Sequence, residues 1–299
     1  RDAKPQDLFS REIIIGATSG DTGSAAIDGV AGRAKIDIFM LHPLGRVSDV
    51  QRRQMTTVLA PNVYNVAIEG SFDDAQAIVK ALFNDRAFNG RFTVSAVNSI
   101  NWARLMAQIV YYFYTAVRLG APDRPIAYSV PTGNFGDVFA GYVAERMGLP
   151  IERLIVATNV NDILHRALTT GDYSCGTVTA TATPSMDIQV SSNFERLLFD
   201  LAGRDGKGLA KMMADFESTR AMTIPADMLA GSKDLFVSAR IDADGMSDVM
   251  RWAHERTDQV IDPHTAIGLA AARNAGLPAD VPVVTLATAH PAKFRDAVE

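Results

Sequence analysis

The sequence predicts an α/β protein of two domains, each with a parallel sheet and flanking helices. Short apolar segments alternate with helical patterns along the chain, and this alternation is typical of parallel strands joined by helices. A chain of 299 residues that is 47% hydrophobic and 21% charged can bury a full core in one large or two medium domains. Residues 120–125, Gly-Ala-Pro-Asp-Arg-Pro, are interpreted as the linker, which gives domains at 1–120 and 121–299.

The first domain contains four apolar segments of strand length. The predicted strands are 12–15, 36–41, 63–68 and 92–97, and helical patterns follow the last three at 49–59, 72–83 and 102–119. Within the last helix, the apolar stretch 105–117 is shorter than the roughly 20 residues that a membrane span requires. We therefore interpret it as a buried helix.

The second domain continues the alternation of apolar segments and helical patterns. Its predicted strands are 126–130, 154–157 and 283–287, and a helix is expected at 138–147. Two stretches, 168–189 and 204–235, have weaker periodicity and many Thr, Gly and Met residues. We predict that they are insertions around the larger domain.

Two glycine-containing loops point to anion binding. Residues 16–26, Gly-Ala-Thr-Ser-Gly-Asp-Thr-Gly-Ser-Ala-Ala, follow the first strand, and residues 131–137, Pro-Thr-Gly-Asn-Phe-Gly-Asp, follow the strand at 126–130. A strand that leads through such a loop into a helix directs backbone N–H groups at one point, where the helix dipole also favours negative charge. Because neither loop fits GxxxxGK[ST] or GxGxxG, a smaller phosphate-bearing cofactor or substrate is favoured over a nucleotide. Both loops follow strands directly, so we expect the ligand in a cleft between the domains.

Composition excludes several other classes. The net charge of −5 gives no basic footprint for nucleic acid and no polybasic membrane patch. The lone cysteine, Cys175, rules out an intramolecular disulfide and favours a reducing, cytoplasmic compartment, and we interpret it as structural or incidental rather than as a nucleophile. The five histidines show no metal-ligand spacing, so no metal site is predicted.

Six segments together carry a resemblance to a known family. In chain order they are SGDTGSAA, VNSINWAR, PTGNFGD, TPSMDIQVSSNFERLLF, DPHTAIG and LATAHPAKF. Taken together they closely resemble threonine synthases of the bacterial and fungal type, from about Ile13 to the C-terminus. The resemblance implies a fold-type II pyridoxal-phosphate enzyme with a tryptophan synthase β-like fold. Such enzymes convert O-phospho-L-homoserine and water to L-threonine and phosphate by γ-elimination and β-addition of water, the last step of threonine biosynthesis, as carbon–oxygen lyases acting on phosphates.

The resemblance also assigns cofactor-binding residues. The loop at 133–137 resembles the part of the family that binds the phosphate of pyridoxal phosphate. Thr288 matches the residue whose hydroxyl meets the pyridine nitrogen, and Asp21 occupies a place where many fold-type II enzymes carry an Asn near the cofactor's 3′ oxygen. The implied cofactor residues are therefore Gly133, Asn134, Phe135, Gly136, Asp137, Thr288 and Asp21.

Substrate binding is implied at two further places. One set resembles the loop that receives the substrate's carboxylate and comprises Thr18, Ser19, Gly20 and Thr22. A second set resembles the binding site for the substrate's phosphate and comprises Asn98, Ser99 and Arg104. Arginine suits that role because its planar fork holds two phosphate oxygens at once.

The resemblance leaves the catalytic lysine unassigned. Family members bind the cofactor through a Lys in a Phe-Lys-Asp segment upstream of the SGDTG loop, and this sequence has no such segment. Lys4, in Ala-Lys-Pro, is not interpreted as that residue, and Lys293 near Thr288 is a weaker alternative. We expect that an N-terminal part of the protein is missing from the numbering and carries the lysine.

Two alternatives stay open at this point. A different fold-type II lyase, such as a dehydratase or a β-replacing enzyme, would use the same cofactor loop without a phosphate clamp at Arg104. A non-catalytic ligand-binding protein could keep the fold without the lysine. Under the main prediction we expect O-phospho-L-homoserine as the small-molecule substrate, no nucleic-acid or membrane partner, and a monomer, with a dimer as the alternative.

Overall fold

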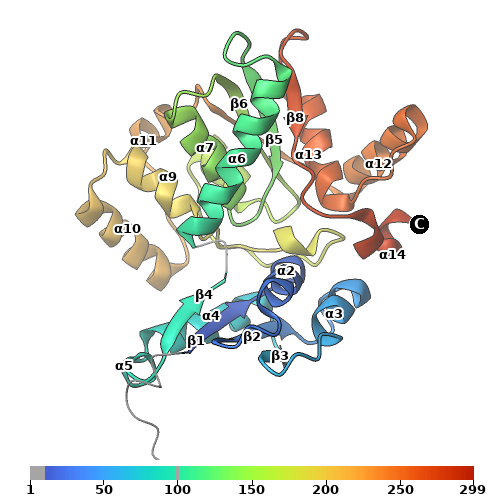
Figure 1. Ribbon diagram of the computed structural model, residues 1–299. Coiled ribbons are helices and arrows are strands. Elements are labelled where there is room, and N and C mark those ends of the chain that lie inside the picture. The colour runs from blue at the N-terminus through green and yellow to red at the C-terminus, as the bar shows by residue number, and fades with distance from the viewer. Residues whose placement is uncertain (1–10, 98–100) are drawn as a thin grey trace, which may run out of the picture. The chain divides into compact units, whose positions relative to one another are not determined.

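The computed structural model describes residues 11–97 and 101–299, which form two compact units, one ending at Asn101 and the other starting at Trp102. Each unit contains a four-stranded sheet whose neighbouring strands are parallel, so the predicted α/β class is confirmed. Figure 1 shows strands and helices alternating along much of the chain. Within the described ranges, no helix is both long enough and apolar enough to cross a membrane.

The first unit has the strand order β3-β2-β1-β4. Its strands are β1 (Glu12–Ala17), β2 (Ile36–Pro43), β3 (Val63–Ile68) and β4 (Thr93–Ala96). Its helices are α2 (Asp21–Val30), α3 (Asp49–Thr56), α4 (Phe72–Asn84) and α5 (Arg86–Asn89). All four strands lie where the apolar runs predicted them.

Helices cover both faces of the first sheet, and the consecutive residues Ile14 and Ile15 of β1 pack on opposite faces. Ile14 belongs to the core beneath α2 and α3, where Ile27 and Met55 are fully buried. Ile15 belongs to the core beneath α4, together with Val79. Because side chains alternate along a strand, a parallel strand buried on both faces needs an unbroken apolar run, as β1 has.

The second unit has the strand order β7-β6-β5-β8. Its strands are β5 (Ile126–Pro131), β6 (Ile151–Thr158), β7 (Phe236–Arg240) and β8 (Val283–Thr285). Its helices are α6 (Trp102–Leu119), α7 (Gly136–Arg146), α8 (Ile163–Thr170), α9 (Phe194–Leu201), α10 (Gly206–Thr219), α11 (Ala226–Ala230), α12 (Ala243–Thr257), α13 (Pro263–Asn274) and α14 (Arg295–Val298), with the short 3₁₀ helices η1 (Pro184–Met186) and η2 (Pro291–Lys293).

The second core lies on both faces of β5 and β6. Every residue of β5 is buried. Along β6, Leu154 and Val156 join the core that contains α6 and α7, while Ile155 and Ala157 join the core that contains α13. These two strands therefore hold the loops at their carboxyl ends on a rigid platform.

Helix α6 packs with the second unit. Its buried residues Leu105, Tyr112 and Ala116 share a core with β5 and α7, whereas the boundary predicted at residue 120 would assign the helix to the first domain. The helix is also not buried throughout. Its exposed apolar residues are Trp102, Met106, Val110, Tyr111, Tyr114, Val117 and Leu119.

The two predicted insertions differ from each other in structure. Residues 171–193 contain η1 and an isolated bridge between Asp172 and Thr223, but no longer element. Residues 204–235 contain α10 and α11. The sequence prediction has no strand at β7, because Phe236–Arg240 is a short edge strand that mixes Ser and Arg with apolar residues and lacks the apolar run of β5.

Candidate functional site

The loop between β5 and α7 forms a tight turn at the carboxyl end of a fully buried strand. Phe135, the N-cap of α7, has the left-handed backbone angle φ 61°, and its N–H donates to Thr132 Oγ1 at 3.1 Å. No side chain caps α7. The backbone N–H groups of its first turn are therefore the donors that the fold offers to an anion at this position.

A second motif, residues 184–194, packs directly against this loop. A Cβ atom on Gly133 would lie 2.9 Å from the Ser185 carbonyl oxygen, so only glycine fits there without a shift. The carbonyl of Asn134 accepts hydrogen bonds from the Asn193 backbone N–H and Nδ2, both at 3.1 Å. Ser192 Oγ donates to Asn134 Oδ1 at 3.0 Å, which orients the amide. Two segments that the sequence singled out separately thus form one structure.

Asp137, in the first turn of α7, carries a buried carboxyl oxygen. Its Oδ1 has no hydrogen-bond partner, and the Tyr112 hydroxyl of α6 donates to its backbone carbonyl at 2.7 Å. Burial raises the pKa of Asp137 to about 7, although Tyr112 and the positive charge of Arg104 act in the opposite direction. Burial also lowers the pKa of Arg104, and the charges of Tyr111 and Asp137 oppose that shift. The two residues assigned to different phosphates, Asp137 and Arg104, therefore act on each other electrostatically.

Replacing Asp137 by Asn is expected to stabilise the fold in a pH-dependent way. The folded-state pKa of Asp137 lies above its ordinary value of 3.8, so the stability due to its proton is complete below pH 3.8 and is lost as the pH rises through about 7. A neutral amide avoids that loss, so the Asn variant should gain about 2 to 4 kcal/mol relative to the wild type above pH 7. Urea unfolding of both proteins across this range measures the difference, and a difference that does not change with pH would contradict the buried-carboxyl assignment.

Thr288 follows β8, the strand next to β5. The backbone N–H of Leu286 donates to the Ser129 carbonyl at 3.0 Å, which extends the β5–β8 pairing to the edge where the Gly133 loop begins. Thr288 itself is exposed just beyond this edge. Adjacent parallel strands bring their following loops together, so this position is compatible with the predicted role, which stays a prediction.

Asp262 and His264 form a buried pair that the sequence analysis did not assign. Asp262 caps α13, and its Oδ1 accepts from the His264 backbone N–H at 2.9 Å and contacts His264 Nδ1 at 3.0 Å. On the other side of the ring, the Ser185 N–H donates to His264 Nε2 at 3.4 Å, and Phe294 packs edge-on at 4.8 Å. The segments DPHTAIG, TPSMD and HPAKF therefore meet at one imidazole. Asp followed by Pro at a helix start was the sequence signal for the cap.

Burial and hydrogen bonding compete at Asp262 and at a second carboxylate, Asp187. Burial raises the pKa of Asp262, but hydrogen bonds from His264 and Thr265 outweigh it and lower the pKa overall. At Asp187 burial prevails and the pKa is raised. Asp187 Oδ1 accepts from Asn159 Nδ2 at 2.7 Å and Asn161 Nδ2 at 3.0 Å, so this partly buried carboxylate is held by the loop that follows β6. The network fixes residues 179–187 next to the Gly133 loop.

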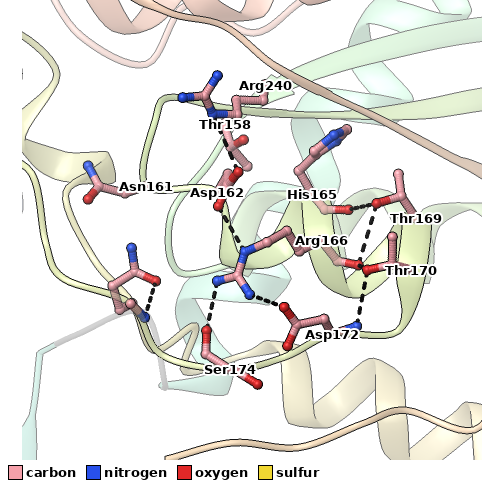
Figure 2. A network of polar contacts seen from close by, with 12 residues as sticks. Thr158, Asn161, Asp162, His165, Arg166, Thr169, Thr170, Asp172, Ser174 and Arg240 are labelled. Atoms are coloured by element: carbon pink, nitrogen blue, oxygen red, sulfur yellow. Dashed lines mark hydrogen bonds and ion pairs between the residues drawn. The ribbon is translucent and has the colours of Figure 1, made fainter.

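Figure 2 shows the polar network that anchors the start of the same long segment. Arg166 of α8 binds Asp162 Oδ1 through Nε at 3.0 Å, pairs with the Asp172 carboxylate and donates to the Ser174 carbonyl at 2.7 Å. Arg240 at the end of β7 contacts Asp162 at 3.4 Å. One guanidinium therefore ties α8 to the chain that leads into residues 175–193.

Substituting Arg166 by Met should release that chain. The substitution removes the contacts of Arg166 with Asp162, Asp172 and Ser174. Because these groups are partly exposed, we expect the free energy of unfolding to fall by about 1 to 2 kcal/mol. Urea unfolding measures the change. Arg251→Met is the matched control, because its pair with Asp248 is 70% exposed on both sides and should contribute less than about 0.5 kcal/mol. Equal effects of the two substitutions would contradict the anchoring role.

The loop after β1 in the first unit is stabilised from within. Thr18 is 1% exposed, and its Oγ1 accepts hydrogen bonds from the backbone N–H groups of Gly20 and Gly23, both at 2.9 Å. Thr18 and Gly20, both assigned to the substrate's carboxylate, are thus bonded to each other, and Gly23 adds a second donor to the same hydroxyl. Gly20 has φ 133°, and a Cβ there would overlap the Gln51 side chain.

Gln51 connects the starts of α2 and α3. Its Nε2 donates to Asp21 Oδ1 at 3.1 Å, and it forms a capping box with Ser48. Asp21 and Thr22 therefore lie in the first turn of a helix whose entry is fixed by buried contacts, with Ser19 just before it. Their assigned ligand contacts stay predictions.

Asn98 and Ser99 lie outside the described residues. Lys293 lies in η2, where His290 is the N-cap and accepts from the Ala292 N–H at 3.2 Å. In the part of the chain that the structure describes, no group of three or more His, Cys, Asp or Glu residues is arranged to hold a metal ion.

Comparison with known proteins gives consistent results. The family description "Pyridoxal-phosphate dependent enzyme" matches residues 3–227, and "Threonine synthase, C-terminal" matches residues 265–299. The chain is 53% identical to the threonine synthase of Pseudomonas aeruginosa over 97% of this chain and 62% of that protein. It is 43% identical to that of Saccharomyces cerevisiae over 98% of this chain and 61% of that protein. The chain thus spans about three fifths of the length of these relatives.

Solved structures agree with the fold. The pyridoxal-phosphate-bound threonine synthase of Brucella melitensis is 52% identical, with a TM-score of 0.89 over 97% of this chain and 62% of that chain. The yeast threonine synthase is 42% identical, with a TM-score of 0.87 over 97% of this chain and 60% of that chain. The architecture is therefore the fold-type II architecture. On the strength of the match over residues 3–227, the chain belongs to the family of pyridoxal-phosphate dependent enzymes.

Proposed function

We propose that the protein binds pyridoxal 5′-phosphate and acts as a threonine synthase, releasing phosphate from O-phospho-L-homoserine and adding water to give L-threonine. The observation that carries the proposal is the structure of the β5–α7 loop. Gly133 packs too closely against Ser185 to be replaced without a shift, and the helix that follows has no side-chain cap. The similarity to threonine synthases over nearly the whole chain supports the specific reaction.

The loop fits the phosphate of the cofactor. Gly133 lets the loop pack closely against Ser185, and the amide of Asn134 is held in place by Ser192. Backbone N–H groups at the start of α7 can then approach phosphate oxygens closely without a side chain intervening. Thr288, beyond β8, would meet the pyridine nitrogen with a neutral hydroxyl. Bound pyridoxal phosphate supplies the electron sink for negative charge that develops on the substrate's carbon atoms.

In the proposed enzyme, side chains of this chain bind and orient the substrate. The loop of Thr18, Ser19, Gly20 and Thr22 would receive the substrate carboxylate, and its internal hydrogen bonds keep it in one shape before the substrate arrives. Asp21 would lie beside the cofactor's 3′ oxygen. Arg104 would hold the substrate's phosphate, with Asn98 and Ser99 as neutral donors, and would keep the leaving group in place as the C–O bond breaks.

The lysine that links the cofactor is not assigned to any described residue. The family's Phe-Lys-Asp segment does not occur in the printed sequence. In the proposed enzyme, a carbon–oxygen lyase acting on a phosphate ester, the described residues bind and orient the ligands. Lys293 in η2 stays the weaker alternative.

A dehydratase or β-replacing enzyme of the same fold is the second candidate. It would use the Gly133 loop but would not require a phosphate clamp. The native polypeptide that carries this sequence should release threonine and phosphate in equal amounts from O-phospho-L-homoserine, with little turnover of serine or threonine. Deamination of serine without turnover of the phosphorylated substrate would favour the second candidate.

A further inference from the structure

Helix α13 supports both sides of the close contact between Gly133 and Ser185. A Cβ atom on Gly268 would lie 3.0 Å from Pro131 Cδ, so the middle of the helix packs directly against the end of β5, where the Gly133 loop begins. At the start of the same helix, His264 Nε2 accepts from the Ser185 backbone N–H at 3.4 Å. One helix therefore fixes the loop and the segment that packs on it.

The neighbours of His264 require a single tautomer of its ring. Nδ1 lies 3.0 Å from Asp262 Oδ1, and Asp262 is 1% exposed. Although burial opposes ionisation, hydrogen bonds from His264 and Thr265 lower the pKa of Asp262, so its carboxylate is an acceptor near neutrality. Nδ1 therefore carries the hydrogen, which leaves Nε2 as the acceptor. The Ser185 N–H is a donor, so both neighbours require the same neutral ring.

The imidazole is enclosed, and its contact with Ser185 bears on the shape of the loop. His264 is 3% exposed, and Phe294 packs edge-on against the ring at 4.8 Å. The carbonyl oxygen of Ser185 is the atom that a Cβ on Gly133 would approach to 2.9 Å. Asp187 ties the same short turn to the loop after β6, and His264 adds the tie to α13. The position of Ser185 against Gly133 is thus determined from two directions.

We propose that His264, oriented by Asp262, is a positioning residue for the cofactor, because its neutral imidazole holds Ser185 against Gly133 and so keeps the loop in the shape that receives the phosphate of pyridoxal phosphate. The inference deepens the proposed function and rests on it, because it takes the Gly133 loop as the phosphate site. His264 acts through Ser185 in this role. Without the acceptor at Nε2, part of the binding free energy of the phosphate is used to restore the loop.

Two substitutions separate the two ends of the ring. His264→Gln places an amide oxygen near the position of Nε2, whereas His264→Asn places an amide nitrogen near the position of Nδ1. Titration of the native polypeptide with pyridoxal phosphate, followed by absorbance, measures the affinity. We expect His264→Gln to bind within about twofold of the wild type, and His264→Asn and His264→Leu to bind about tenfold more weakly. A role limited to the bond with Asp262 predicts the opposite order for Gln and Asn.

Exchange of the Ser185 amide hydrogen, followed by NMR without cofactor, tests the contact itself. It should be faster in His264→Asn and His264→Leu and close to the wild-type rate in His264→Gln. Val249→Ala on α12 removes buried methyl groups, so it should lower the urea midpoint and leave the affinity unchanged. His254→Asn is the matched control, because it makes the same substitution at a side chain that is 63% exposed and should change neither measurement.

The inference is overturned if His264→Leu binds pyridoxal phosphate as the wild type does, or if His264→Asn binds it more tightly than His264→Gln. An equal loss of affinity in Val249→Ala and His264→Asn would also overturn it, because the effect would then be general destabilisation. The comparison of Gln with Asn decides the question even where His264→Leu does not fold. Failure of the wild type to bind pyridoxal phosphate would count against the proposed function and hence against this inference, whereas normal wild-type binding with an unchanged Ser185 exchange rate in His264→Asn would overturn the inference alone.

Discussion

Replacing Phe135 by Ala should lower the free energy of unfolding by about 3 to 5 kcal/mol and disrupt the Gly133 loop with it. The ring is fully buried and packs edge-on against Phe194 at 5.2 Å and tilted against Phe236 at 6.0 Å. Removing it leaves a cavity where α7, α9 and β7 meet. The same residue has the positive φ at the start of α7, so the turn of the loop and this part of the core meet at one position.

Urea unfolding measures the loss, and binding of pyridoxal phosphate to the folded variant measures the effect on the loop. Phe199→Ala is the matched control, because Phe199 is 37% exposed on α9 and should contribute much less. Phe135→Leu should restore part of the stability because it refills part of the cavity. Equal losses for Phe135→Ala and Phe199→Ala would contradict the structural role given to Phe135.

Replacing Arg104 by Gln should lower kcat/KM for O-phospho-L-homoserine by about 100- to 1000-fold, because two charge-assisted hydrogen bonds to phosphate contribute about 3 to 4 kcal/mol. The guanidinium lies near the start of α6, where burial already lowers its pKa. Burial in a site of low dielectric strengthens its attraction for a dianion. Kinetics with native and variant polypeptides measure the change.

Arg118→Gln on the same helix is the control. Arg118 stacks on the Tyr114 ring at 5.3 Å in the last turn, away from the loop, and its loss should leave kcat/KM unchanged. Arg104→Lys should recover only part of the activity, because a single ammonium cannot bind two oxygens in a fixed plane. A fully active Arg104→Gln variant would show that another residue holds the substrate's phosphate.

The parallel sheets could be predicted because their central strands carry the strongest local signal. The isoleucines of β1 and the buried residues of β5 form apolar runs, and glycine-containing loops follow both strands. Where the signal is weaker, the prediction was incomplete. β7 is an edge strand with a mixed sequence. Helix α6 buries residues on one face only, and the sequence showed neither the unit with which this helix packs nor which of its apolar residues are exposed.

The candidate site was only partly accessible from the sequence. Motif recognition singled out the Gly133 loop and the segment at 184–194, but their contact through Asn134 and Asn193 depends on tertiary structure. The same holds for the Asp262–His264 pair, whose partner Ser185 lies far away in the chain. The bonds that the Thr18 hydroxyl accepts from its own loop were likewise not evident from the sequence, and its assigned ligand contact stays a prediction.

The most direct test of the account is the product ratio from O-phospho-L-homoserine with the native polypeptide saturated with pyridoxal phosphate. Threonine and phosphate should appear in equal amounts, and omission of the cofactor should abolish both. Release of phosphate with a 2-oxo acid and ammonia in place of threonine would contradict the central claim, because the site would then eliminate without adding water. Absence of turnover in the cofactor-saturated native polypeptide would contradict it as well.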